Sequence, residues 1–343
     1  MPRPTRTISI DRDDPDPAAL AEAAQVLRAG GLVAFATETV YGLGAVATDP
    51  AAVARIFDAK GRPSFNPLIV HASDLDMARA CVDRWPPAAE ALARAFWPGP
   101  LTLVLPRSAI IPDIVAANLS TVGVRIPAPA VARDLIRATG RPLAAPSANR
   151  STALSPTLAA HVARSLGDAV EIILDSGPTA VGIESTVLDL SGPRPAIVRP
   201  GVLTAATISD LLGIEVADRP RATSAPSSPG QLSIHYAPRT PAVSIGPERL
   251  ATFAWPPRFA LLVLGDPGPI ADPGAVAIRS LSTPAEAAAA LYATLHDWDD
   301  LALDLIALVP PPDRPEWSAI RDRITRATKR IAAEDTEEEK KFY

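Results

Sequence analysis

The densest cluster of residues that could carry chemistry is TETVYGLG, residues 37–44, which directly follows the apolar run Leu32–Ala36. It places two hydroxyls, a carboxylate and a phenol beside two flexible glycines. Polar groups at the end of a buried strand are where α/β sheets bind ligands. The segment is therefore a candidate ligand site. Threonines and tyrosines also cap strands, and glycines also make turns, so the segment alone leaves a purely structural role open.

The second candidate is KGRPSFNPL, residues 60–68, a loop stiffened by two prolines. Lys60 offers a compact charge, Arg62 a planar fork of donors and Asn66 an amide, a set that suits a polyphosphate. Four of the 33 cationic side chains are lysines, and Lys60 is the only one in the first 328 residues. This isolation fits a required lysine, but chance could also leave one. His71 follows at an expected strand end, where an imidazole orients a small polar ligand or fills a structural position.

Arg125 lies inside the apolar run STVGVRIP, residues 120–127. An arginine buried without an anion is strongly destabilising, so this one needs a partner unless it lies at a strand end. A carboxylate-bearing ligand and an internal Asp or Glu satisfy that need equally well. Further hydroxyl, amide and guanidinium groups come from the segments PSANRS, ESTVLDL and VRPG and from Thr157, all at expected element ends.

The elements that position these segments follow from the apolar pattern. Before residue 218, β-rich apolar runs alternate with helical stretches, which predicts an α/β domain with a mixed sheet. Side-chain oxygens ahead of a proline, in Asp49-Pro50 and Ser155-Pro156, predict two helix starts. The other expected strands are Leu101–Leu105, Val122–Ile126, Glu171–Leu174 and Thr186–Leu190, and the expected helices lie near 50–58, 87–96, 129–139 and 157–166.

Residues 218–241 carry five prolines and four serines, which predicts a linker or lid. They separate a domain over 1–217 from a smaller α/β domain over 242–332, which a charged tail over 333–343 follows. Thr283-Pro284-Ala285-Glu286 predicts a capping box at a helix start. Nothing in this half looks catalytic. Its expected strands are Ala242–Ile245, Phe259–Leu264, Val276–Ile278 and Leu303–Val309, with helices near 284–296 and 315–331.

Composition excludes several classes of protein. A chain of 343 residues that is 48% hydrophobic folds and is long enough for two domains. One cysteine, Cys81, closes no internal disulfide and builds no thiolate cage, and the four histidines are too scattered to suggest a metal site. Walker A, Gly-x-Ser-x-Gly and His-Glu-x-x-His motifs are missing from the sequence. Without a signal peptide or a membrane-length apolar run, a cytoplasmic protein is expected.

Taken in order, TETVYGLG, KGRPSFNPL with His71, STVGVRIP, PSANRS, ESTVLDL and VRPG resemble the YrdC/Sua5 family of threonylcarbamoyl-AMP synthases. SPG at 228–230 and HYAP at 235–238 resemble the long Sua5-type form. The resemblance implies a twisted mixed-sheet YrdC-like domain and a smaller Rossmann-like α/β Sua5 C-terminal domain. It also implies an enzyme that joins L-threonine, bicarbonate and ATP into threonylcarbamoyl-AMP and pyrophosphate. That product would pass to a tRNA threonylcarbamoyl-transfer complex for t6A at tRNA position 37.

The resemblance also assigns site residues. It implies a threonine-binding set in which Arg125 meets the carboxylate, namely Thr39, His71, Arg125, Ser147 and Ser185. The implied ATP-binding set is Lys60, Arg62, Asn66, Thr121, Asn149, Thr157, Arg199 and Tyr236, with Lys60 and Arg62 catalytic and Tyr236 closing the site as part of a lid. Mg²⁺ would arrive on the ATP phosphates, without ligands from the protein. The chain departs from the family pattern at residues 231–234, within the expected lid.

Two rival functions remain to be weighed. A non-enzymatic double-stranded RNA-binding module would use a basic surface, but residues 1–217 hold 19 Lys and Arg against 21 Asp and Glu. Direct contact with tRNA therefore has only weak support. A carbamoyl-transfer enzyme of the hydrogenase-maturation type shares this domain, but it would need zinc-finger cysteines and an acylphosphatase segment, for which this chain has no room.

Overall fold

The computed structural model describes residues 4–218, 236–266, 268 and 272–330. Contacts along the chain divide it into two compact units. The first contains Met1–Ser151 and Ser155–Gln231, and the second contains Thr152–Leu154 and Leu232–Tyr343. The part of the predicted linker over 219–235 and the predicted tail over 333–343 lie outside the described residues.

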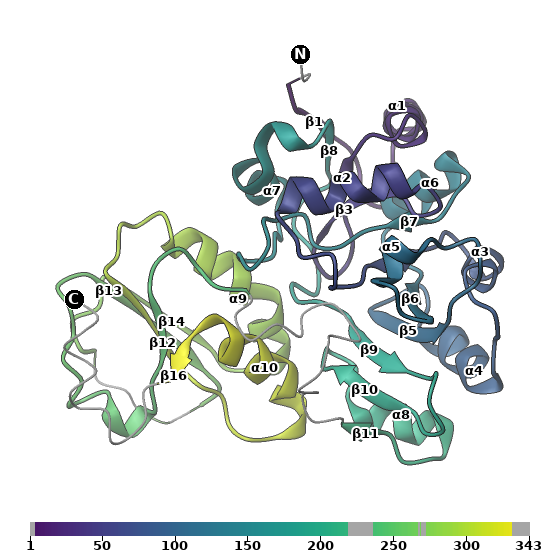
Figure 1. Ribbon diagram of the computed structural model, residues 1–343. Helices are drawn as coiled ribbons and strands as arrows, with labels where there is room; N and C mark the ends of the chain where they lie inside the picture. The colour runs from purple at the N-terminus through teal and green to yellow at the C-terminus, as the bar shows by residue number, and fades with distance from the viewer. Residues whose placement is uncertain (1–3, 219–235, 267, 269–271, 331–343) are drawn as a thin grey trace. The chain divides into compact units, whose positions relative to one another are not determined.

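Within its described residues, the first unit forms an 11-stranded mixed sheet in the order β1-β8-β2-β3-β7-β4-β6-β5-β9-β10-β11 (Figure 1). Its strands are β1 (Arg6–Ser9), β2 (Val33–Ala36), β3 (Tyr41–Val46), β4 (Ile69–His71), β5 (Leu101–Pro106), β6 (Thr121–Arg125), β7 (Leu143–Ala144), β8 (Ile172–Asp175), β9 (Thr186–Asp189), β10 (Ala196–Arg199) and β11 (Ala217–Asp218). Its helices are α1 (Pro17–Arg28), α2 (Pro50–Lys60), α3 (Leu75–Ala80), α4 (Pro87–Phe96), α5 (Asp113–Ala116), α6 (Ala130–Thr139), α7 (Ala159–Leu166), η1 (Gly167–Ala169) and α8 (Ala205–Leu212).

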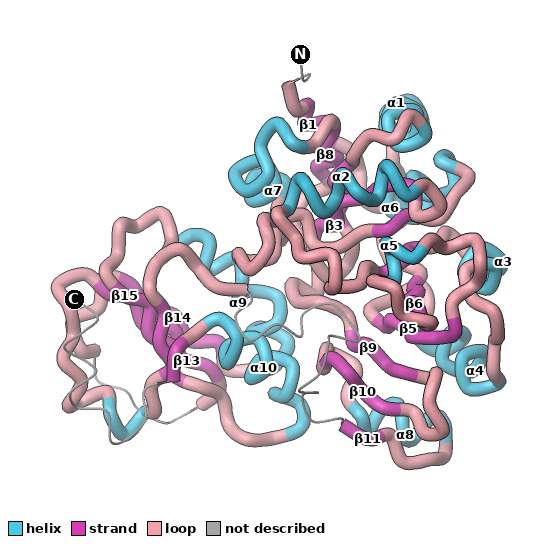
Figure 2. The backbone as a smooth tube through the Cα atoms, viewed as in Figure 1, coloured by secondary structure: helices cyan, strands magenta, loops and turns pink. Residues whose placement is uncertain are grey.

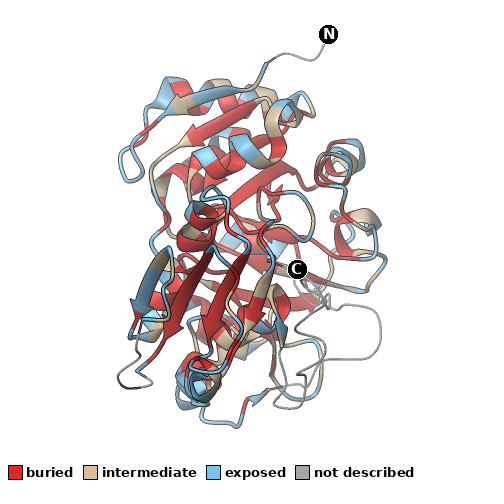
Figure 3. Cartoon of the chain, turned by 90° about the vertical axis from the view of Figure 1, so that its left-hand side faces the viewer, coloured by how far each residue is buried: buried red, intermediate tan, exposed pale blue. Residues whose placement is uncertain are grey.

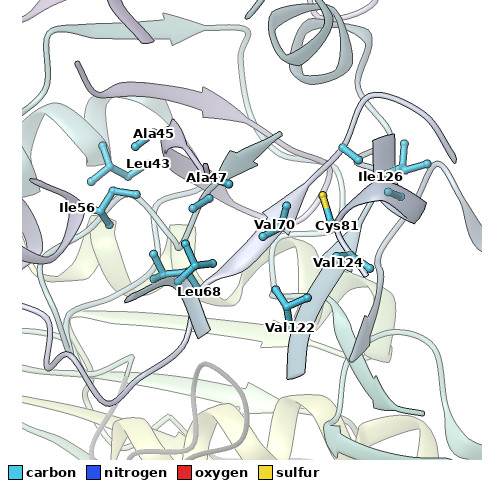
Figure 4. Close-up of a cluster of buried hydrophobic side chains, with 14 of the residues drawn as sticks. Leu43, Ala45, Ala47, Ile56, Leu68, Val70, Cys81, Val122, Val124 and Ile126 are labelled. Carbon is cyan, nitrogen blue, oxygen red and sulfur yellow. The ribbon is translucent and has the colours of Figure 1, made fainter. Parts of the chain in front are cut away.

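The helices of this unit lie around its strands (Figure 2), and the central strands β2, β3 and β4 are buried along their whole length (Figure 3). The edge strand β1 is largely exposed. Side chains alternate across a strand, and β2 shows the result: Val33 and Phe35 pack in one apolar cluster, whereas Ala34 and Ala36 pack in another. The first cluster is covered by apolar residues of α1 and α6. The second is larger and includes side chains of β3, β4, β6 and α2 (Figure 4). The sequence prediction of an α/β domain with a mixed sheet is confirmed.

Of the two predicted helix starts in the first unit, one is confirmed and one is wrong. Asp49 caps α2 as predicted, because its carboxylate accepts hydrogen bonds from the amides of Ala51 and Ala52 at 2.9 and 3.2 Å. The prediction for Ser155 was wrong. Its hydroxyl donates instead to the buried carboxylate of Glu184 at 2.5 Å, and α7 begins only at Ala159. A tertiary carboxylate therefore outcompeted the local cap.

The second unit forms a parallel sheet of five strands within its described residues, in the order β14-β13-β15-β12-β16. The predicted capping box is present, with Thr283 and Glu286 bonded to each other's backbone amides. The elements are β12 (Ala242–Ser244), η2 (Pro247–Arg249), β13 (Phe259–Leu264), β14 (Ala277–Leu281), α9 (Pro284–Trp298), β15 (Leu305–Val309), η3 (Pro315–Trp317), α10 (Ser318–Ala327) and β16 (Lys329–Arg330). This arrangement confirms the predicted smaller α/β domain.

The last residues of the predicted linker are fixed within the second unit. The amide of Ala237 donates to the carbonyl of Thr152 at 3.0 Å, and the amide of Thr240 donates to Asp299 at 2.9 Å. Among the described residues, the helices are all too short or too polar to cross a membrane.

Candidate functional site

Arg125 lies at the end of β6, and its guanidinium is buried in the first unit. Its Nη1 donates to the hydroxyl of Thr39 at 3.2 Å, and its Nη2 pairs with Glu38 Oε2 at 3.4 Å. The internal carboxylate that the sequence left open is thus Glu38. The Nε–H of Arg125 remains buried without a hydrogen-bond partner in the described structure. One donor of the guanidinium fork is therefore available to a ligand carboxylate.

The Thr39 hydroxyl is held in place by its own hairpin between β2 and β3. It lies 2.8 Å from the hydroxyl of Thr37, which in turn donates to the carbonyl of Val40 at 2.7 Å. All three residues are buried. This local network fixes a hydroxyl beside the guanidinium of Arg125.

His71 ends β4 and is the Cα partner of Arg125 in the parallel pairing of β4 with β6. Its ring packs edge-on against Phe35, and Nδ1 lies 3.3 Å from the carbonyl of Ile69. Burial, with a smaller contribution from the charge of Arg125, lowers the pKa of His71 well below its ordinary value. The imidazole is therefore neutral at neutral pH, so one of its ring nitrogens can act as an acceptor.

Ser185 and Arg199 meet at the junction of β9 and β10. Arg199 Nε donates to the carbonyl of Ser185 at 3.1 Å, and Nη2 donates to its hydroxyl at 3.1 Å. The same hydroxyl lies 2.8 Å from that of Thr102 in β5. The structure thus joins one predicted threonine-binding residue to one predicted ATP-binding residue, and it adds Thr102, which the sequence did not single out.

Lys60 ends α2, and its buried ammonium reaches the loop that follows β7. Nζ donates to the carbonyl of Ser147 at 2.6 Å, to the carbonyl of Asn149, and more weakly to Asn149 Oδ1 at 3.4 Å. Burial, followed by the charge of Arg62, lowers the pKa of Lys60 well below its ordinary value. Three predicted site residues therefore form one hydrogen-bonded group.

Arg62 and Asn66 lie in the loop after α2. Arg62 Nε donates to the carbonyl of Asn66 at 3.1 Å, and Nη2 donates to that of Pro67 at 2.9 Å. The side-chain amide of Asn66 is fully buried, and neither its nitrogen nor its oxygen has a hydrogen-bond partner in the described structure. A buried donor and acceptor without partners suit a ligand that supplies both.

The remaining predicted site residues are Thr157, Thr121 and Tyr236. Thr157 is buried ahead of α7, and its amide donates to Nδ1 of His161 at 3.3 Å. Thr121 begins β6 and is half-buried. Tyr236 belongs to the second unit, where its ring lies 5.7 Å from that of Tyr292 and the guanidinium of Arg323 lies 5.5 Å from its centre.

Sequence patterns could not single out several contributors to these groups. Thr102 and His161 lie in apolar segments that look like ordinary core, and only the pairing of β5 with β9 and the first turn of α7 bring them to their partners. Glu184 was seen only as part of a motif, and its partner Ser155 is 29 positions away. Contacts between distant segments leave no periodic signal in a single sequence.

Comparisons with known proteins cover both units of the chain. A family model described as "Telomere recombination" matches residues 25–201, and one described as "Threonylcarbamoyl-AMP synthase, C-terminal domain" matches residues 203–328. The threonylcarbamoyl-AMP synthase of Bacillus subtilis is 39% identical over 334 residues, which cover 94% of this chain and 95% of that protein. The synthase of Pyrococcus abyssi is 47% identical over 230 residues, 66% of this chain and 68% of its own length.

Among solved structures, the crystal structure of P. abyssi Sua5 complexed with L-threonine is similar to this chain with a TM-score of 0.83. The sequences are 36% identical in that comparison, which covers 95% of this chain and 100% of the other. The match extends over both the mixed-sheet unit and the parallel-sheet unit. The chain therefore belongs to the YrdC/Sua5 family of threonylcarbamoyl-AMP synthases, with both the YrdC domain and the Sua5 C-terminal domain.

Proposed function

We propose that the first unit joins L-threonine, bicarbonate and ATP into threonylcarbamoyl-AMP and pyrophosphate. The enzyme is a threonylcarbamoyl-AMP synthase, a nucleotidyltransferase, and its product serves the t6A modification of tRNA. A tRNA threonylcarbamoyl-transfer complex would receive that product. The proposal places the enzyme in the cytoplasm.

The observation that carries the threonine side of the proposal is the free Nε–H of Arg125, buried beside the fixed hydroxyl of Thr39. A carboxylate there would form charge-assisted hydrogen bonds in a region that excludes water, where such bonds are strongest. The neutral His71 and the hydroxyls of Ser147 and Ser185 complete the proposed threonine-binding set. The P. abyssi relative was solved in complex with L-threonine, which supports threonine as the ligand.

On the nucleotide side, the proposed set is Lys60, Arg62, Asn66, Thr121, Asn149, Thr157, Arg199 and Tyr236. The two unpaired polar atoms of Asn66 would meet a donor and an acceptor of ATP. Lys60 holds the loop at Ser147 and Asn149, and its long bond to Asn149 Oδ1, 3.4 Å, is the one that a phosphate oxygen would replace. In this way Lys60 would both shape the site and meet the nucleotide.

The chemistry is an in-line displacement. The amino group of L-threonine first condenses with bicarbonate, with loss of water, to give N-carboxythreonine. A carbamate oxygen of N-carboxythreonine then attacks the α-phosphorus of ATP, the new oxygen–phosphorus bond forms, and the bond to the leaving pyrophosphate breaks. Such a reaction depends on alignment of the two reactants and on cations that stabilise the charge of the leaving group. Lys60 and Arg62 are the proposed catalytic cations, because both are buried and lie at one end of α2.

A Mg²⁺ ion is proposed to enter on the ATP phosphates. Within the described residues, groups of three or more His, Cys, Asp or Glu side chains that could hold a metal are not found. The polar groups of the proposed nucleotide set are cationic, amide or hydroxyl, which suits phosphate oxygens rather than a bare cation. When bound there, Mg²⁺ would neutralise charge on the phosphates.

Titration calorimetry with L-threonine and ATP, added in both orders, tests this function. If the two substrates share one site, each should bind more tightly when the other is present, because coupling between ligands is reciprocal. The proposal fails if L-threonine does not bind the folded protein. It also fails if ATP binds and threonine has no effect on it, while double-stranded RNA binds in the same buffer.

A further inference from the structure

The ion pair of Arg125 and Glu38 contains two buried polar atoms that have no hydrogen-bond partner in the described structure. Arg125 Nε is a donor, and Glu38 Oε1 is an acceptor. Arg125 is 2% exposed and Glu38 is 6% exposed. Unpaired buried donors and acceptors are rare in folded proteins and destabilise them, so each calls for an explanation such as a missing ligand or water.

Glu38 is held rigidly, so its free oxygen has a fixed direction. Its Oε2 accepts hydrogen bonds from the amide of Ala128 at 3.0 Å and from Arg125 Nη2 at 3.4 Å. Its backbone carbonyl accepts from the amide of Val181 at 2.7 Å. Because Oε2 and the main chain are occupied, Oε1 is the oxygen that remains for a ligand.

The guanidinium of this ion pair offers a hydrogen-bond donor, and its carboxylate offers an acceptor. They complement a ligand that carries an acceptor and a donor close together. An α-amino acid is such a ligand, since its carboxylate and its amino group are attached to the same carbon. We propose that Glu38 Oε1 accepts a hydrogen bond from the amino group of the substrate while Arg125 Nε–H donates to its carboxylate. Glu38 is then the residue that selects α-amino acids over acids that lack the amino group.

This inference deepens the proposed function, because it rests on threonine binding at Arg125. Recognition of both ends of an α-amino acid also explains why a positive and a negative side chain, Arg125 and Glu38, lie side by side. Arg125 alone would attract any carboxylate, whereas the adjacent negative charge of Glu38 repels an acid that brings no compensating amino group. The pair therefore provides both an attractive and a repulsive element.

The test compares two ligands on the full-length protein by calorimetry: L-threonine and its desamino analogue (R)-3-hydroxybutyrate. The variant is Glu38→Gln, which keeps the size and removes the charge. The matched control is Asp189→Asn, since Asp189 is a buried carboxylate at the far end of β9, where it accepts from Ser191. Binding is measured directly, so no assay of the complete reaction is involved.

For the wild type, L-threonine should bind at least about tenfold more tightly than (R)-3-hydroxybutyrate. Glu38→Gln should weaken L-threonine binding by about 10- to 100-fold, as expected for loss of a charge-assisted hydrogen bond. The same change should leave (R)-3-hydroxybutyrate binding unchanged or make it tighter, because it removes a repulsion. Asp189→Asn should alter neither affinity.

Equal weakening of both ligands by Glu38→Gln would overturn the inference, because Glu38 would then act only by holding Arg125. If the glutamine variant does not fold, Glu38→Asp serves instead, since it keeps the charge but retracts the oxygen. The aspartate variant should weaken L-threonine more than the analogue, and an equal effect again overturns the inference. Failure of the wild type to bind L-threonine would instead refute the proposed function itself.

Discussion

At the scale of single residues, the candidate site contains the buried ion pair of Arg125 with Glu38, in which Arg125 Nε and Glu38 Oε1 have no hydrogen-bond partner in the described structure. Arg125 shows how far the sequence could go. A cation inside an apolar strand predicted an anionic partner, but only the structure shows that Glu38 supplies part of the compensation and that Nε remains free. The identity of the partner depends on a residue 87 positions away in sequence, which no local pattern encodes.

Arg125→Lys tests the role of the guanidinium fork. Lysine keeps the positive charge but lacks the planar fork, so it cannot bond Thr39 and Glu38 and still present the Nε–H to a carboxylate. We expect L-threonine to bind about 10- to 100-fold more weakly, with ATP affinity changed by less than about threefold. Calorimetry with each substrate alone checks this. Equal losses for both substrates would show that Arg125 supports the whole site rather than the carboxylate.

His71 predicts a pH dependence of stability. Because burial lowers the pKa of His71 in the folded state, the unfolded chain binds more protons just below the ordinary histidine pKa of about 6.5. The contribution of buried, neutral His71 to folding stability is therefore fully present above that pH and is lost as the pH falls below it. His71→Gln should make denaturant-derived stability decline less steeply between about pH 6.5 and 5. Parallel curves for the two proteins would contradict the assignment.

At the scale of elements, the sequence predicted which segments are helices or strands better than it predicted where they begin and end. Strand β13 was predicted with its observed ends, and α2 and α9 began where their caps were predicted. Helix α7 began later than predicted, because Ser155 bonds to Glu184 rather than to the helix amides. Local capping chemistry therefore predicts a boundary only where no distant group competes for the cap.

The loop after β7 depends on Lys60. Lys60→Met keeps the apolar stem but removes the donor to the carbonyls of Ser147 and Asn149. Removing the charged donor to these buried acceptors should lower the free energy of unfolding by about 1–3 kcal/mol, and ATP binding should fall. Arg150→Met, which removes an exposed cation next to the same loop, is the control and should change neither. Unaltered stability and ATP affinity in the Lys60 variant would refute this role.

The capping box of α9 allows a prediction for the second unit. Thr283→Ala removes the hydroxyl that accepts from the amide of Glu286 at 3.2 Å. Stability should fall by about 1 kcal/mol in denaturant unfolding of the full chain. Ser282→Ala at the preceding exposed position retains the backbone amide and should have little effect. A loss of the same size in both variants would mean that the cap is not responsible.

At the scale of the whole molecule, the chain consists of two units, each with its own sheet and apolar core. The alternation of strands and helices predicted both α/β layers, and a proline-rich stretch predicted the division between them. The inclusion of Thr152–Leu154 in the second unit could not be predicted, because it depends on a contact between the loop after Ser151 and the segment at Ala237. The catalytic role of residues 1–217 and the lid role of residues 218–241 stay predictions.

Expression of residues 1–217 alone tests the division of labour. The large buried core of the first unit predicts a folded product with cooperative thermal unfolding. Synthesis of threonylcarbamoyl-AMP should nevertheless fall strongly, because the segment with Tyr236, the proposed lid, is missing. Full turnover by the truncated protein would show that Tyr236 and the second unit are dispensable for the reaction.

The most direct measurement is the fate of labelled bicarbonate incubated with the full-length protein, ATP, Mg²⁺ and L-threonine. We predict that the label enters threonylcarbamoyl-AMP in equal amount with the pyrophosphate released. Formation of both should require all three substrates, and Lys60→Ala with Arg62→Ala should abolish it in a folded protein. Pyrophosphate release without threonine, or normal synthesis by that double variant, would contradict the account.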